Sequence, residues 1–236
     1  MTTDFKVRLQ ALIDELDSPL RAQAEQDINA LLNAGVDSYQ TLVCLVDNKS
    51  IDERLRAIAC WALGKLKDKK SVAILLKAFD SKIPILYWEA SKALGSIKSR
   101  KALKPLVNIL LQDEDIEKRV ASAYALGLLR DKRAIEPLLR VLQNKAEQPK
   151  VRAQTAEALV WFNDRRKTVV DSLIVGLKDA SVEVRFWSAF ALGELKIKRA
   201  VNKLKQMAAE DAEVLPGWWS ISREASNAID RITQGG

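Results

Sequence analysis

The chain has 236 residues, of which 38 are lysine or arginine, 31 are aspartate or glutamate and none is histidine, so its net charge is +7. Without histidine it cannot use His-based acid–base catalysis, a Ser–His or Cys–His nucleophile pair, or the commonest ligand of transition metals. Two cysteines, an acidic N-terminal stretch without an apolar core, and no apolar run near ~20 residues predict a cytoplasmic protein with no membrane span.

An Ala-Leu-Gly step and its variants recur along the chain at a nearly constant interval. The alanines of the successive copies are Ala30, Ala62, Ala93, Ala125, Ala158, Ala191 and Ala228, at steps of 32, 31, 32, 33, 33 and 37 residues. Copies at such a period are typical of a solenoid, in which each repeat packs only on its neighbours.

Each copy contains two helix-like runs, of which residues 134–142 and 151–159 are examples. Their apolar residues recur at spacings of three and four, which places them on one face of an α-helix, and no stretch alternates as a strand would. We therefore predict an all-α fold, an α-solenoid of about seven helix pairs forming a right-handed superhelix in a single domain. The predicted units are residues 1–35, 36–68, 69–99, 100–131, 132–164, 165–197 and 198–236.

The Ala-Leu-Gly step falls late in the second helix of each unit. Small side chains there allow neighbouring helix axes to approach to the close end of the ~8–10 Å range. We expect the glycine to suit the C-terminus of that helix, where the chain leaves for the next repeat. The step is therefore interpreted as core packing and not as a catalytic motif.

A longer pattern is clearest in residues 118–142 and 184–201. It runs from Val-Arg through paired alanines and Ala-Leu-Gly to a charged turn and an Ala-Ile-x-Pro-Leu segment. It resembles the HEAT-like repeat of the phycobilisome-lyase type over nearly the whole chain, with departures at Tyr87, Val160 and Ser222. The resemblance implies the solenoid fold, and its unit occurs in bilin lyases, phycobilisome-degradation factors and adaptor proteins.

An arginine occurs six residues before the repeat alanine in four units. These residues are Arg56, Arg119, Arg152 and Arg185. In one interpretation they pair with turn carboxylates such as Asp52, Asp115 and Asp179 and form a structural ladder. In the other, they present a row of guanidinium groups to a carboxylate-bearing ligand or an acidic peptide.

Basic residues also gather in the loops that join one unit to the next. The set, called here the basic ridge, is Lys67, Lys69, Lys70, Lys98, Arg100, Lys101, Arg130, Lys132, Arg133, Arg165, Arg166, Lys196, Lys198 and Arg199. Such a row could follow an anionic surface or nucleic acid, or it could offset the dipoles of the preceding helices. No known nucleic-acid-reading motif accompanies it, so nucleic acid is not the expected partner.

Positions one and five residues before the repeat alanine predict an outward-facing column on the second helices. Its members with aromatic or charged side chains are Trp61, Trp88, Lys92, Tyr124, Glu157, Phe186 and Phe190, and Trp187 and Trp161 lie nearby. If the second helices line the concave side, these residues form a partly apolar groove for a partner. The alternative is that each aromatic ring packs between adjacent second helices.

Three further features have mainly structural interpretations. Trp218 and Trp219 follow a Pro-Gly step and are expected to seal the last core, or else to contact another chain. Cys44 and Cys60 are both expected to be buried thiols.

The leading hypothesis is a non-enzymatic scaffold that holds a helix or an extended segment of a partner protein in this groove and needs no cofactor. The alternative implied by the resemblance is a bilin lyase or bilin-handling factor, with the bilin as bound substrate, a phycobiliprotein as partner and a second subunit where needed. The third hypothesis is binding of nucleic acid or an anionic surface along the basic ridge.

Overall fold

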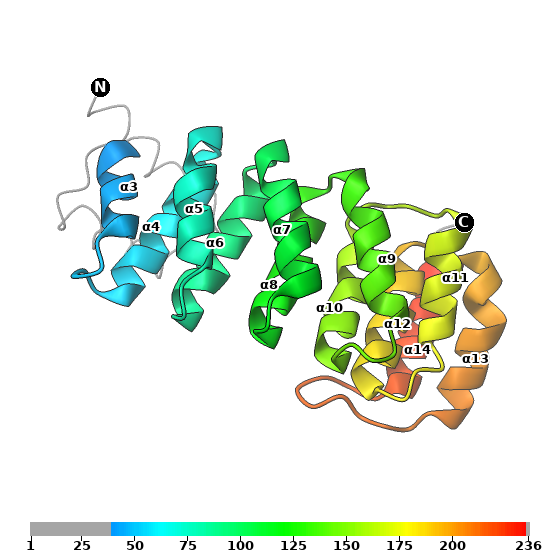
Figure 1. Cartoon of the computed structure of the whole chain (residues 1–236). Helices are drawn as coiled ribbons and strands as arrows, with labels where there is room; N and C mark the ends of the chain where they lie inside the picture. The colour runs from blue at the N-terminus through cyan, green and yellow to red at the C-terminus, as the bar shows by residue number, and fades with distance from the viewer. Residues whose placement is uncertain (1–38, 235–236) are drawn as a thin grey trace. The chain divides into compact units, whose positions relative to one another are not determined.

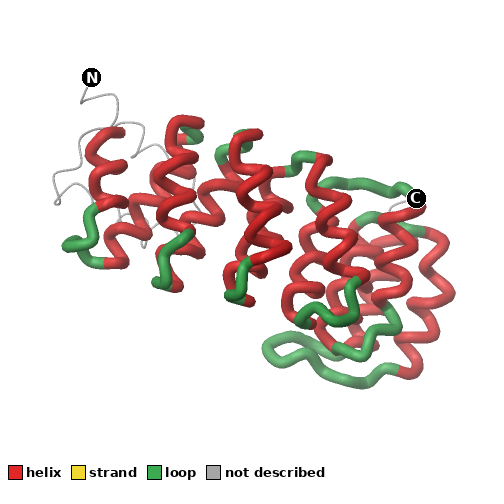
Figure 2. The backbone as a smooth tube through the Cα atoms, viewed as in Figure 1, coloured by secondary structure: helices red, strands yellow, loops and turns green. Residues whose placement is uncertain are grey.

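The computed structural model describes residues 39–234, and these residues form twelve α-helices and three short 3-10 helices (Figures 1 and 2). The only extended pairing in this range is an isolated bridge between Val214 and Ser220. The chain divides into two compact units, Met1–Pro105 and Leu106–Gly236. They are called units 1 and 2 from here on, and the smaller helix pairs are called repeats. The predicted first repeat, residues 1–35, and the copy at Ala30 lie outside the described residues.

The helices alternate between first and second members of each repeat. Unit 1 contains α3 (Tyr39–Asp47), α4 (Glu53–Leu66), α5 (Val72–Phe79) and α6 (Pro84–Ser96), and the division falls within α7 (Arg100–Gln112). Unit 2 continues with α8 (Ile116–Leu129), α9 (Ile135–Gln143), α10 (Pro149–Val160), α11 (Lys167–Gly176), α12 (Val182–Glu194), α13 (Val201–Glu210) and α14 (Ile221–Thr233). Odd-numbered helices are the first helices and even-numbered ones the second helices.

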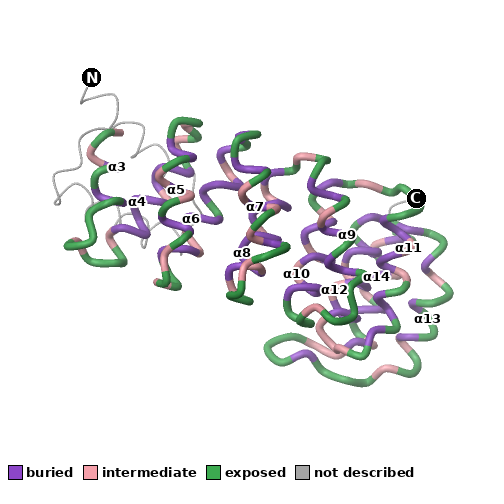
Figure 3. Tube along the Cα trace, viewed as in Figure 1, coloured by how far each residue is buried: buried purple, intermediate pink, exposed green. Residues whose placement is uncertain are grey.

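Contacts between the helices follow the order of the chain. The most extensive ones join successive second helices, α4 to α6 in unit 1 and α8 to α10, α10 to α12 and α12 to α14 in unit 2. First helices pack on their own second helices, as in α5 on α6 and α13 on α14. Buried residues lie along the helices while much of the connecting chain is exposed (Figure 3). The predicted all-α solenoid is confirmed.

Successive second helices touch through the glycine of one repeat and the alanine of the next. A methyl group on Gly64 would lie 2.7 Å from the Cα of Ala93, and one on Gly193 would lie 2.8 Å from the Cα of Ala228. Real carbon atoms do not approach this closely, so the contact requires glycine. The expectation that small residues bring the second helices together is confirmed.

The glycine lies in the last turn of the second helix, near its C-terminus, but it is not the residue that ends the helix. Gly64 lies inside α4, and the residue with a left-handed backbone is Lys67, whose amide donates to the Gly64 carbonyl at 3.2 Å. The same left-handed conformation, with φ between 47° and 56°, occurs at Lys67, Lys98, Arg130, Asn163 and Lys196. The chain therefore leaves α4, α6, α8, α10 and α12 through a basic residue or an asparagine.

Asp52 and Asp115, which the ladder interpretation paired with arginines, instead cap the second helices α4 and α8. Asp52 accepts from the amides of Arg54 and Leu55 at the start of α4. Asp115 accepts in the same way at the start of α8. These carboxylates satisfy amides that have no partner within the helix, and they lie at the favourable end of its dipole.

The two cysteines differ in exposure. Cys60 lies in the core of unit 1, and burial raises the pKa of its thiol to about 12. Cys44 is exposed, so its expected burial is wrong. Leu42, Leu45 and Val46 form the buried face of α3, and a residue two positions from Leu42 points to the opposite side of a helix.

The outer face of α14 is polar. Its buried residues are Ile221, Glu224, Ala225, Ala228 and Ile232, while Arg223, Ser226 and Asp230 are exposed. This face closes the hydrophobic core of unit 2, as the atypical end repeats of solenoids do. None of the helices in the described residues is long and apolar enough to span a membrane.

The glycine contact predicts that replacing Gly64 with alanine lowers the stability of the protein, the opposite of the usual effect in a helix. Gly-to-Ala substitution within a helix normally stabilises it by about 0.5–1 kcal/mol. Gly64→Ala should instead lower the free energy of unfolding by about 1–3 kcal/mol, because the methyl group forces α4 and α6 apart. The shift in the urea midpoint measures the effect, and Lys65→Ala, an exposed neighbour, is the control and should change little. A stabilised Gly64→Ala variant would contradict the contact.

Candidate functional site

The guanidinium groups of the four in-register arginines donate hydrogen bonds to carbonyl and carboxylate groups of the chain itself. Arg56 donates to the Val46 carbonyl at 3.0 Å, and Arg119 donates to the Asp113 carbonyl at 2.6 Å and to Glu147 at 2.9 Å. Glu147 belongs to the following repeat, so the guanidinium of Arg119 connects two repeats. Arg56 is buried and Arg119 partly buried.

The ladder continues through unit 2. Arg152, only 5% exposed, forms an ion pair with the buried carboxylate of Asp179. Arg185 donates to Asp211 at 2.7 Å and to Glu213 at 2.8 Å. In each pair the carboxylate comes from a later turn. These contacts form the structural ladder, and a ligand carboxylate would have to displace them.

Asp179 is the most strongly perturbed carboxylate of this ladder. Burial alone would raise its pKa, but hydrogen bonds from Arg152 and Lys145, with the Ser181 amide, outweigh burial and lower the pKa of Asp179 to about 2. The Lys145 ammonium lies 2.5 Å from the carboxylate. The carboxylate is therefore ionised at neutral pH and bound on several sides.

In unit 1 the outward column contains two partly exposed tryptophans. Trp61 lies under the ammonium of Lys65 at 5.8 Å, and Trp88 contacts Tyr87 with a centroid distance of 6.4 Å. Lys92 is exposed and pairs with Glu89 at 2.7 Å. Tyr87, which replaces the arginine of other repeats, is buried.

In unit 2 the column is partly exposed at the position one residue before each repeat alanine. Tyr124 on α8, Glu157 on α10 and Phe190 on α12 each precede a repeat alanine and are partly exposed. Phe186, at the level five residues before the alanine, is 0% exposed. Its outward position is therefore covered by another part of the chain.

The cover over Phe186 is the connection between α13 and α14, residues 211–220. Trp218 and Trp219 lie on Phe186 with ring-centroid distances of 5.5 and 6.0 Å. Trp187 contacts Phe190 at 5.3 Å and Trp218 at 5.2 Å, both edge to face. Five aromatic rings from one helix and one loop thus form a continuous cluster.

The two tryptophans of the loop differ in role. The indole of Trp219 donates to the fully buried Glu224 at 2.8 Å, so it helps to seal the core as expected. Trp218 is 47% exposed. The loop is closed by the Ile221 amide on the Glu213 carbonyl at 2.8 Å, and it turns at Gly217 with φ of 82°. Trp218 is thus an exposed aromatic residue on an ordered loop.

Glu157 is the charged residue among these aromatics. Burial raises the pKa of its carboxyl, and the hydrogen bond from Gln154, 2.7 Å long, opposes that rise. Within residues 39–234 its carboxylate has no ion pair. A cation of a partner would therefore meet a partly desolvated carboxylate here.

We call Tyr124, Glu157, Trp187, Phe190 and Trp218 the second-helix surface of unit 2. Of these, the column positions identify Tyr124, Glu157 and Phe190, and the sequence places Trp187 near them. Trp218 belongs to no repeat position; the Pro-Gly step before it marked it for core sealing or for a contact with another chain. The described residues contain no group of three side chains placed to hold a metal ion. The surface is suited to binding another molecule through apolar contact.

The basic ridge is exposed at all fourteen positions. Several of its cations are nevertheless paired locally: Arg133 with Asp131 at 2.6 Å and Arg166 with Asp164 at 2.8 Å. Arg130 lies over the ring of Trp161 at 5.1 Å. The local pairs reduce the charge available to a polyanion.

Comparison with known proteins gives one family. The model described as HEAT repeats matches the chain in four overlapping stretches, residues 41–115, 78–149, 103–168 and 144–215. A search of curated proteins found no match.

Three solved structures are similar in fold. An engineered protein is 21% identical and has a TM-score of 0.50, covering 85% of this chain and 98% of its own. Computationally designed armadillo repeat proteins for modular peptide recognition are 16% identical with a TM-score of 0.48, covering 83% of this chain and all (100%) of their own. The complex of CpcE and CpcF of phycocyanin lyase from Nostoc sp. is 16% identical with a TM-score of 0.49, and the match covers 98% of this chain and 94% of that one.

The Asp179 pair predicts a pH-dependent stability. Because the pKa of Asp179 is lowered to about 2 in the folded chain, its ion pairs contribute fully above the unfolded pKa near ~3.9 and are lost as pH falls towards 2. Asp179→Asn should therefore be destabilised at pH 7 by about 3 kcal/mol, since Arg152 is left buried and unpaired. This deficit should shrink by about 2 kcal/mol at pH 2.

Urea unfolding of both proteins from pH 7 to pH 2 measures this difference. Lys145→Gln is the control: its side chain is 59% exposed, so its loss should cost less than about 1 kcal/mol. A deficit in Asp179→Asn that does not vary with pH would show that the ion pair is not its cause.

Proposed function

Because the chain belongs to the HEAT-repeat family, we propose that it is a scaffold that binds a partner protein through the outward faces of its second helices. The observation that carries this proposal is the aromatic cluster of unit 2. Trp187, Phe190 and Trp218 form a continuous, partly exposed apolar surface that ends in a tryptophan with almost half of its surface in water.

Such a surface costs solvation free energy when it is left uncovered. Monomeric proteins rarely expose contiguous apolar patches unless the patch binds something, and tryptophan is enriched among residues that dominate binding energy. The loop of Trp218 is ordered by its own backbone hydrogen bonds, so little entropy is lost when a partner contacts the ring. These features support a binding role for the surface.

The proposed contact residues differ slightly from those expected from sequence. We retain Trp61, Trp88 and Lys92 in unit 1 and the second-helix surface in unit 2. Phe186 is left out because it has no exposed surface. Arg119, Arg152 and Arg185 support the surface from the acidic turns, because their guanidinium groups are held by the chain.

A finer assignment, to the phycobilisome-lyase type with a bilin as substrate, rests on the sequence resemblance. A bilin would need cations for its two propionates, and the arginines expected to supply them are engaged by carboxylates of the chain. Bilin binding is therefore the second candidate.

Polyanion binding along the basic ridge is the third candidate. Four ridge residues, Lys67, Lys98, Arg130 and Lys196, lie at the C-termini of second helices, where cations offset the negative end of the helix dipole. This accounts for those four positions without a polyanion. An affinity for a labelled oligonucleotide that falls by several powers of ten between 50 and 200 mM salt would favour this candidate, and salt-independent or absent binding would dismiss it.

The scaffold proposal predicts the effect of losing Trp218. Peptides selected on the native protein from a random dodecapeptide display library should bind the Trp218→Ala variant at least about thirtyfold more weakly, the loss expected for a central interface tryptophan. Fluorescence anisotropy of the selected peptides measures their Kd.

Val175→Ala is the matched control for this experiment. Val175 is 58% exposed but lies on a first helix, α11, away from the proposed contact residues. Its loss should leave the Kd unchanged. Equal weakening in both variants, or none in Trp218→Ala, would refute the proposed surface.

The bilin alternative is tested by titration with phycocyanobilin, following tryptophan fluorescence and the visible absorption band. We expect no sharpening or red shift of the band at micromolar concentrations, because the guanidinium groups are already paired. A sharpened, red-shifted band with strong quenching would place a stretched tetrapyrrole against the tryptophans and favour the bilin function over the scaffold.

A further inference from the structure

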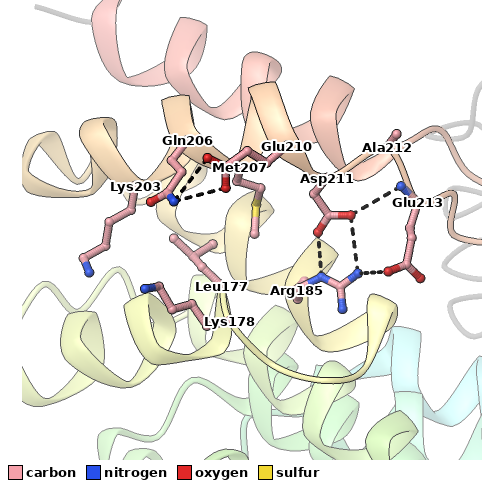
Figure 4. Close-up of a pocket in the computed structure, with 10 residues that line it drawn as sticks. All are labelled: Leu177, Lys178, Arg185, Lys203, Gln206, Met207, Glu210, Asp211, Ala212 and Glu213. Atoms are coloured by element: carbon pink, nitrogen blue, oxygen red, sulfur yellow. Dashed lines mark hydrogen bonds and ion pairs between the residues drawn. The ribbon is translucent and has the colours of Figure 1, made fainter.

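A pocket of about 570 Å³ opens in unit 2 away from the second-helix surface. It is lined by the end of α11, by one stripe of α13 and by the turn that follows α13 (Figure 4). The α13 residues of this stripe are Lys203, Gln206, Met207 and Glu210, which are three and four positions apart and so share one helix face. Its volume is within the range of ligand pockets.

The floor of the pocket is apolar. Leu177 and Met207 are 5% and 7% exposed. Figure 4 shows the thioether of Met207 extending from α13 towards Leu177. Methionine adapts its shape to different apolar groups, so this floor can accept an aliphatic side chain.

The charges on the rim are separated. Figure 4 shows the ammonium groups of Lys178 and Lys203 on one side of Leu177, and Arg185 with Asp211 and Glu213 on the other. Arg185 is saturated by those two carboxylates. Neither Lys178 nor Lys203 has an ion pair or a side-chain hydrogen bond within residues 39–234.

The positive charge of Lys203 also lies where the electrostatic potential of α13 is unfavourable to a cation. It lies in the first turn of α13, which contains no acidic residue, and a cation there opposes the positive end of the helix dipole. Nothing in the packing of α13 compensates, since the side chain is exposed. Basic residues also occupy the first turns of α7, α10 and α11, so this position supports a role for Lys203 only together with the pocket that it lines.

We propose that this pocket binds the C-terminus of a partner protein whose last side chain is apolar. The free carboxylate lies between Lys178 and Lys203, and the last side chain packs on Leu177 and Met207. Glu213, beside Arg185 on the opposite rim, accepts from a backbone N–H group that precedes the carboxylate, through the oxygen lone pairs that its ion pair with Arg185 leaves free. A fatty acid offers the same carboxylate and apolar chain but has no donors for that acidic rim.

The sequence provides a reporter for this pocket. The chain has two methionines, Met1 and Met207, and only Met207 lines it. In protein labelled with ¹³C at the methionine methyl groups, Met207→Leu assigns the Met207 signal by removing it, and the Met1 signal serves as an internal reference. The full chain is titrated with acetyl-Gly-Leu-Leu bearing a free carboxylate, with its C-terminal amide, and with octanoate.

We expect the free-acid peptide to shift the Met207 signal saturably and the amide to bind at least about tenfold more weakly, because a charge-assisted hydrogen bond is lost. Lys178→Gln and Lys203→Gln should each weaken binding of the acid about tenfold while leaving the weak binding of the amide unchanged. Lys203→Arg, which keeps the charge, should restore it. Lys205→Gln, an exposed lysine on α13 outside the pocket, is the matched control.

Three results would overturn the proposal. Equal binding of acid and amide would leave only an apolar crevice. Tighter binding of octanoate than of the peptide would assign the pocket to a small amphiphile. Absence of any saturable shift, or an equal loss in Lys205→Gln, would show that the two lysines form no site. Because both lysines are exposed, their glutamine variants should fold, and circular dichroism verifies this.

Discussion

The close contact between the glycine of one second helix and the alanine of the next is the constraint on which the rest of each unit depends. Gly64 on Ala93 and Gly193 on Ala228 bring two backbones together at distances that no side chain allows. In Gly127 the same approach is made to Ala158, with Trp161 closing the other side. The contact fixes the spacing of the repeats, and this spacing decides which groups of neighbouring repeats can meet.

The arginine ladder is one consequence of that spacing. A guanidinium group on a second helix reaches the acidic turn of the next repeat, as Arg119 reaches Glu147 and Arg185 reaches Asp211. Arg152 does the same from α10, where Val160 stands in place of the glycine. The ladder then holds the turns that cap the second helices. Backbone packing, ion pairs and helix caps therefore support the same geometry, although each involves different residues.

Periodic features of the sequence predicted most of this architecture. The helix pairs, the small residues at the close contact and the in-register arginines each recur every 31–33 residues across the central repeats, so their environments recur as well. Phe186 could not be placed in this way, because its burial depends on the loop carrying Trp218 and Trp219, which has no counterpart in the other repeats. The left-handed residue that ends each of α4, α6, α8, α10 and α12 was not identified either, since a lysine, arginine or asparagine in that region carries no signal comparable to glycine.

The same distinction separates structural residues from candidates for function. Buried side chains that obey the repeat are used within it: the ladder arginines have carboxylate or carbonyl partners, and the repeat alanines are buried. Side chains that depart from it retain unused capacity, such as the exposed ring of Trp218 and the ammonium group of Lys203, which has no ion pair within residues 39–234. Both departures lie in the last repeats of unit 2, where the connection between α13 and α14 is longest. In a fold whose repeats use their buried polar and small residues on one another, binding capacity remains in the outward column of the second helices and where the repeat is broken.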